Sequence, residues 1–159
     1  MNLSHFFNSV QLSPESKTVR DIVALNDKTK EYGLVLTPND VKTMITSRNK
    51  VLHDYARVEL STEVLKELIE LYAASPYMDQ NHYVETLNDL QEIFYYLRNE
   101  TEDKINDVKL INQMMDYFNG SCAGSVELLR SKMEQLAENF RSDLISGKSP
   151  LQGDDKTWD

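Results

Sequence analysis

Arg48 has an unusual setting for a charged residue, because it interrupts an apolar stripe. If the segment that begins near Pro38 is a helix, its apolar side chains recur every three or four residues and share one face. These side chains are Val41, Met44, Ile45, Leu52 and Tyr55. Arg48 falls in the middle of them, where an unpaired guanidinium would cost several kcal/mol. A partner for this charge must therefore exist.

Two kinds of chemistry could provide that partner. The first is structural: an ion pair with a carboxylate from another helix, or a long side chain that carries its charge to the surface. The second is functional: the guanidinium binds an anionic ligand, or a carboxylate of another protein, with its forked donors. We expect one of the two structural arrangements, because structural ion pairs are commoner than ligand sites.

Residues 83–100 carry three further candidates for binding. At helical spacing, Tyr83 falls on the apolar face, and Tyr96 falls opposite it on an acidic side. Tyr96 is thus expected at the surface, as an interface residue or as an ordinary exposed one. Arg98 lies in the last turn, where a cation complements the helix dipole. The acids that follow it lack the spacing of a calcium loop, and we expect a solvated acidic loop there.

Metal and cofactor sites have little support in the sequence. His82 and Glu85 lie one helical turn apart and could share a metal, but two ligands do not make a site. We predict no metal and no cofactor. The segment GSCAGS, residues 120–125, could offer free backbone N–H groups to a phosphate, but it lacks the ending of a P-loop. A tight turn between helices, with Cys122 as a buried thiol, is the expectation we favour.

The elements that would position these residues are helices. Six segments have helical periodicity, at about 15–31, 37–55, 62–74, 80–98, 106–119 and 125–145, and none shows sustained strand alternation. Thr37 with Pro38, and Asn106, are predicted helix starts, whereas Gly33 and Gly120 are predicted stops. The connections are short, so we predict an all-α, single-domain bundle of five to six mostly antiparallel helices over residues 1–145. Residues 146–159 are rich in Ser, Gly, Pro and Asp, and we expect a disordered tail.

Charge and composition exclude several classes of partner. The chain of 159 residues has a net charge of −9, and residues 61–120 alone carry twelve acidic and four basic side chains. Such a surface repels a phosphate backbone, so no nucleic-acid partner is expected. The longest apolar run, IFYYL, is too short to span a membrane. Cys122 is the sole cysteine and no secretion signal is visible, which predicts a cytoplasmic protein.

Three longer phrases resemble a family of uncharacterised proteins from Firmicutes, mostly clostridial and related bacteria. They are YGLVLTPNDV (32–41), SPYMDQNHYVETLNDLQEIFYYLRNE (75–100) and MMDYFNGSCAGSVELL (114–129). The resemblance spans about residues 30–145, with mild departures at YYLRNE and SCAGS. It implies a bacterial cytosolic protein and transfers no activity and no catalytic residue.

The sequence therefore favours a non-enzymatic helical module for protein interaction or regulation, whose acidic surface meets a basic or mixed protein partner. Association of identical chains stays open. The alternative is a bundle that binds a small anionic ligand in a polar pocket around Arg48, with Tyr83 and Arg98 facing the same cavity. An enzyme of a type without recognisable motifs is the third reading.

Overall fold

The computed structural model describes residues 14–147, and within them it contains helices and no strand. In chain order the elements are α2 (Pro14–Val23), α3 (Asn26–Thr29), the 3-10 helix η1 (Lys30–Tyr32), α4 (Pro38–Asp54), α5 (Glu63–Ala73), α6 (Tyr83–Glu100), α7 (Asp107–Asn119) and α8 (Val126–Ile145). The predicted all-α bundle is confirmed. Of the predicted tail, residues 148–159 lie outside the described residues, as do residues 1–13.

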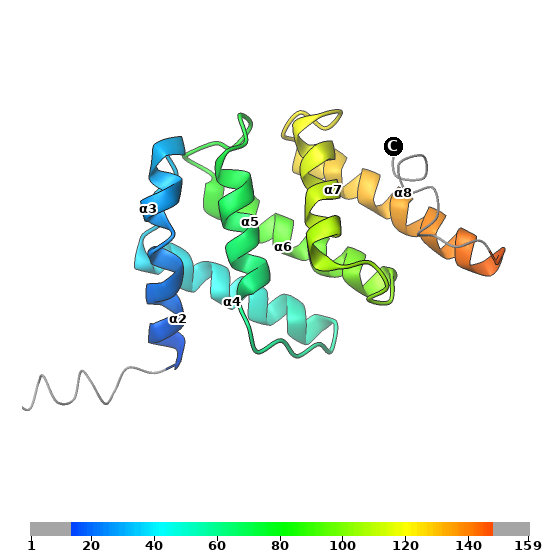
Figure 1. The fold of residues 1–159 in the computed structure, drawn as a ribbon, viewed down its shortest axis with the longest axis horizontal. Helices are drawn as coiled ribbons and strands as arrows, with labels where there is room; N and C mark the ends of the chain where they lie inside the picture. Colours follow the sequence, from blue (N-terminus) through cyan, green and yellow to red (C-terminus); the bar gives the residue numbers. More distant parts are fainter. Residues whose placement is uncertain (1–13, 148–159) are drawn as a thin grey trace, which may run out of the picture.

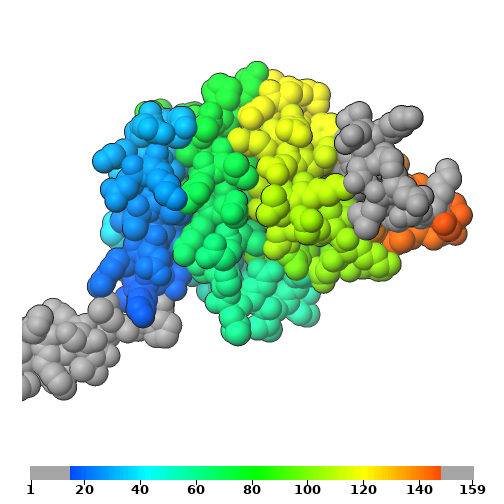
Figure 2. Space-filling view, viewed as in Figure 1, coloured from blue at the N-terminus to red at the C-terminus, as the bar shows by residue number. Residues whose placement is uncertain are grey.

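The helices form two layers, which Figure 1 shows from one side. α2 with α3, α5 and α7 make the front layer, and Figure 2 shows them as adjacent bands. Behind them α4, α6 and α8 lie side by side, with extensive contacts between α4 and α6 and between α6 and α8. Helices of one layer run in the same direction. From α4 onward, consecutive helices belong to different layers, and their axes cross at a large angle and are not antiparallel. Short connections bring helix ends together but do not fix a crossing angle, which side-chain packing decides.

Local sequence signals set the helix ends where they were predicted. The Thr37 hydroxyl accepts a hydrogen bond from the Asp40 amide, and the Asp40 carboxylate accepts one from the Thr37 amide, which completes a capping box. Asn106 caps α7 with one hydrogen bond, which its side-chain oxygen accepts from the Lys109 amide. Gly33 ends η1 with φ +86°.

The first predicted helix is interrupted after Val23, for a reason that lies outside it. The Asn26 side chain pairs with both backbone groups of Leu36, at 2.8 and 2.9 Å, and the Thr29 hydroxyl donates to the Leu34 carbonyl at 2.7 Å. These two polar side chains hold the linker between η1 and α4.

α6 is the central helix and contacts α4, α5, α7 and α8. Its apolar face, Leu87, Leu90, Phe94 and Leu97, is completely buried. The rings of Phe94 and Tyr95 meet edge to face, with centroids 5.1 Å apart. The aromatic run near the end of this helix is therefore mainly core packing. Among the described helices none is both long and apolar enough to cross a membrane.

Candidate functional site

Arg48 is buried and bonds to backbone, which corrects the expected ion pair. Its Nη2 donates to the carbonyls of Glu59 and Ser61, at 2.7 and 2.9 Å, and its Nη1 donates to the Asn49 side chain at 3.1 Å. Within residues 14–147 no carboxylate lies within ion-pair distance of it. The two carbonyls belong to residues 55–62, the α4–α5 loop. Because this loop has no helical periodicity, its return to Arg48 could not be predicted.

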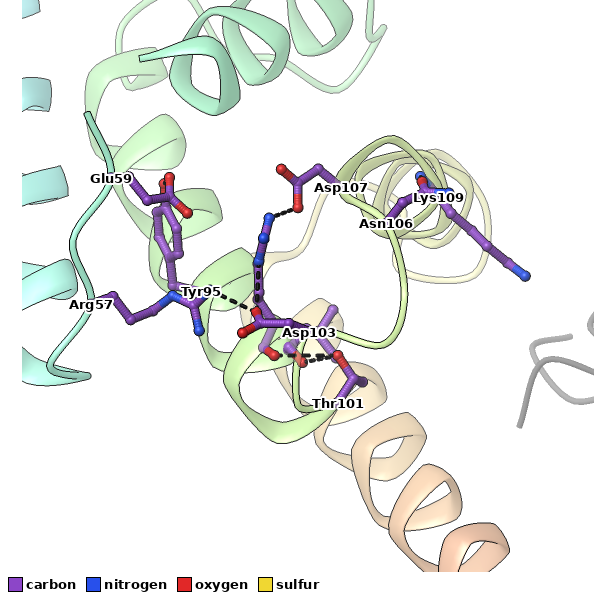
Figure 3. Close-up of polar contacts among 10 residues, drawn as sticks. Arg57, Glu59, Tyr95, Thr101, Asp103, Asn106, Asp107 and Lys109 are labelled. Carbon is purple, nitrogen blue, oxygen red and sulfur yellow. Dashed lines mark hydrogen bonds and ion pairs between the residues drawn. The ribbon is translucent and has the colours of Figure 1, made fainter. Parts of the chain in front are cut away.

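Two more contacts fix the same loop to α6 and to the α6–α7 turn (Figure 3). The Tyr95 hydroxyl donates to the Glu59 carboxylate at 2.7 Å, and burial followed by this bond raises the pKa of Tyr95. Arg57 donates to the Asp103 carboxylate at 2.6 Å. The loop is thus held by α4, α6 and the turn beyond α6. It still exposes Val58 and Leu60, at 87% and 98%.

Arg98 belongs to the same polar cluster. Its Nε lies 2.8 Å from the Asp103 carboxylate, and its guanidinium also contacts Asp107 at the start of α7. Glu102 and Asp103 both have positive φ, +54° and +59°, which is a strained conformation for residues other than glycine. The two arginines that converge on Asp103 offset this strain. Arg98 therefore closes the α6–α7 turn, beside a shallow open groove of about 920 Å³ along α7.

We predict that Asp103→Asn lowers the free energy of unfolding by about 1 kcal/mol at pH 7, since Asn tolerates positive φ but removes the charge that both arginines bind. The hydrogen bond from Arg57 lowers the pKa of Asp103 below its ordinary value of 3.8. The stabilisation that the charged Asp103 carboxylate provides is complete above pH 3.8 and is lost as the pH falls through the lowered pKa. Urea unfolding at pH 7 and pH 2.5 measures it: the difference between wild type and variant should shrink at the lower pH. An equal difference at both pH values would contradict the assignment.

A second site is formed by residues of α6 and α8 and by Tyr55 at the end of α4. Here six residues line a partly enclosed pocket of about 70 Å³, which we call the tyrosine pocket: Tyr55, Glu92, Ile93, Tyr96, Arg130 and Glu134. Tyr55 follows α4, the next three residues belong to α6, and Arg130 and Glu134 belong to α8. Tyr96 is half-buried here, which corrects its expected position at the open surface. The charge of Arg141 of α8 also acts on Tyr96 and partly offsets the rise in its pKa.

Carboxylates outnumber cations around the tyrosine pocket, on a surface that we call the acidic face. The carboxylates are Asp54, Asp89, Glu92, Glu100 and Glu134, and the cations are Lys50, Arg130 and Arg141. Burial, followed by the charges of Glu92 and Glu100, raises the pKa of Tyr55. Burial and then Glu100 raise the pKa of Tyr96, and burial raises the pKa of Asp89. The contributions of Glu92 and Glu100 to these shifts come from their negative charges, and such charges favour a cation at this face.

Tyr83 stands apart from the other predicted residues. Its hydroxyl donates to the Val35 carbonyl at 2.6 Å, so it secures the linker before α4. It lies thirteen residues before Tyr96, about 20 Å along the helix. Arg48 and Arg98, in contrast, both lie close enough to Tyr95 to influence its hydroxyl electrostatically. The four predicted residues therefore do not form one site.

The remaining candidates have structural roles. His82 pairs with Asp79 at 2.9 Å, and across residues 14–147 no three His, Cys, Asp or Glu side chains gather to hold a metal. In the GSCAGS turn, the amides of Gly120, Cys122, Ala123, Gly124 and Ser125 all donate to backbone carbonyls. These groups are not available to a phosphate. Cys122 is buried, as expected of a tight turn.

Four residues of these sites were not predicted from the sequence: Arg57, Glu59, Arg130 and Glu134. Tyr55 was predicted only as a member of an apolar stripe. The spacing of Arg130 and Glu134, four residues apart on one helix, was the one available signal. It does not tell which helix the pair faces. Only the packing of α8 against α6 brings it to Tyr96.

Comparison with known proteins assigns the chain to a family without assigning it an activity. Residues 21–146 match the model of a family of unknown function, DUF6323. The chain belongs to the DUF6323 family. The match covers most of the described helices, from α2 to the end of α8, so both sites lie inside the family's region. No curated protein and no solved structure matches the chain.

Proposed function

We propose that this DUF6323 chain is a non-enzymatic interaction module whose acidic face binds a basic segment of a partner protein. The observation that carries the proposal is the excess of carboxylates on one face built by α4, α6 and α8. Side-by-side helices offer a firm surface for such a segment, and complementary charge speeds and orients the encounter.

The pairing of these carboxylates supports the proposal further. Arg130 Nη2 lies 3.9 Å from both the Asp89 and Glu92 carboxylates, which is too long for a hydrogen bond. In the part of the chain that the structure describes, Glu92 and Glu134 accept no hydrogen bond. The charge of Glu134, and that of Glu92 beyond its long ion pair with Arg130, are therefore open to a cationic partner. A second copy of the chain is disfavoured at this face, because it would present the same excess of negative charge.

The absence of a reaction is part of the same proposal. Cys122 is 3% exposed, and burial raises the pKa of its thiol, so the nucleophilic thiolate is disfavoured. The Nη groups of Arg48 already donate to the α4–α5 loop and to Asn49. We therefore do not retain Arg48 as an anchor for an anionic ligand. The phrases shared with Firmicutes proteins and the single cysteine support a bacterial, cytoplasmic location.

Two matched triple variants test the face. The first, Asp89→Asn, Glu92→Gln and Glu134→Gln, neutralises the acidic face. The second, Asp21→Asn, Glu31→Gln and Glu67→Gln, neutralises three exposed acids on α2, η1 and α5. Each changes the net charge from −9 to −6, so non-specific attraction changes equally.

The probe is a fluorescent peptide of alternating lysine and serine, and the measurement is fluorescence anisotropy at 50 and 300 mM salt. We expect the first variant to weaken binding by about tenfold and the second by less than about threefold. Equal losses in the two variants would mean that the peptide responds to overall charge, and the proposed face would be wrong.

A further inference from the structure

We propose that the tyrosine pocket binds the terminal ammonium group of one lysine side chain. The lysine would belong to the basic segment described above, so the assignment rests on the proposed function for its partner. It goes further in naming one subsite, one chemical group and the residues that contact it.

The volume of the pocket selects the size of the group. A pocket of about 70 Å³ is far smaller than the roughly 300–1,000 Å³ of typical small-molecule sites, so it suits the end of one side chain. The ammonium of lysine is a compact group on a narrow methylene stem, whereas the guanidinium of arginine and a trimethylammonium group each have four non-hydrogen atoms and fit less easily.

The lining of the pocket fits a primary ammonium in charge and hydrogen bonding. Glu92 and Glu134 supply carboxylate oxygens that accept no hydrogen bond within residues 14–147, and an ammonium brings three donors. Tyr55 and Tyr96 supply aromatic rings, and cations near the face of such rings are stabilised by cation–π attraction. Ile93 supplies apolar contact for the methylene.

Arg130 is the internal competitor of the proposed lysine. It lines the same pocket, and its guanidinium lies between the Asp89 and Glu92 carboxylates without bonding closely to either. Its positive charge repels an incoming ammonium and satisfies part of the negative charge. Removing it should therefore strengthen lysine binding, whereas removing the Glu92 charge should weaken it.

The experiment follows the ring resonances of Tyr55 and Tyr96 by NMR during titration with Nα-acetyl-lysine-N-methylamide. This probe carries one charge and no other basic group. The norleucine analogue, which lacks the ammonium, and the arginine analogue serve as comparison ligands. We expect saturable shifts with lysine only, an affinity about threefold higher in Arg130→Gln, and one about threefold lower in Glu92→Gln. Thermal melts of both variants verify that the fold is kept.

The inference is overturned if norleucine or arginine shifts the rings as strongly as lysine, or if both variants change the affinity in the same direction. Its failure can be told apart from that of the proposed function. If the basic peptide distinguishes the two triple variants but the lysine probe leaves the rings unshifted, the pocket is wrong and the face stands. If the probe binds but the peptide does not distinguish the variants, the pocket stands and the face is wrong.

Discussion

Arg48→Ala should lower the free energy of unfolding by about 3 kcal/mol, measured by urea unfolding followed by circular dichroism. The reason is the pair of bonds from Nη2 to the carbonyls of Glu59 and Ser61. Hydrogen bonds from a charged donor are worth more than neutral ones, and truncation leaves two acceptors without this donor. The loss of a buried aliphatic stem adds to the effect.

Two further variants separate charge from geometry at this position. Arg48→Lys keeps the charge but offers a point donor in place of the fork, and we expect it to recover about half of the loss. Arg20→Ala removes an exposed arginine of α2 and should change stability by less than about 0.5 kcal/mol. An Arg48→Ala protein as stable as the wild type would show that the guanidinium does not hold the α4–α5 loop.

Gly124→Ala should be similarly costly, at about 3 kcal/mol. Gly124 has φ +81°, a conformation that costs any residue with a Cβ about 1 kcal/mol. An added Cβ would also lie 2.5 Å from Cβ of Tyr77, closer than real Cβ atoms approach. Cβ is fixed to the backbone, so the α7–α8 turn or the Tyr77 segment would have to move.

Gly33→Ala is the matched control, because Gly33 has nearly the same dihedral, φ +86°. Its added Cβ would meet the end of the Gln80 side chain, which can rotate away. We therefore expect Gly33→Ala to cost only about 1 kcal/mol. Equal losses of unfolding free energy in the two variants would show that the contact with Tyr77 adds nothing.

The fold was largely predictable because its signals are local. The capping box of Thr37 and Asp40, the cap at Asn106 and the apolar spacing along α6 each involve residues within a few positions of one another. The burial of Arg48 was also predictable, since its position on a helix face follows from helical geometry. Its partners were not, because an irregular loop has no period that indicates where it returns.

The acidic face shows the same division between sequence and structure. The acidic side of α6 with Tyr96 on it follows from residue spacing, because spacing fixes which side chains share one side of a helix. The meeting of Tyr55, Arg130 and Glu134 with Tyr96 around a pocket follows from the packing of the folded chain. These residues come from three helices, whose relative rotation depends on how all their side chains pack together and not on any one segment.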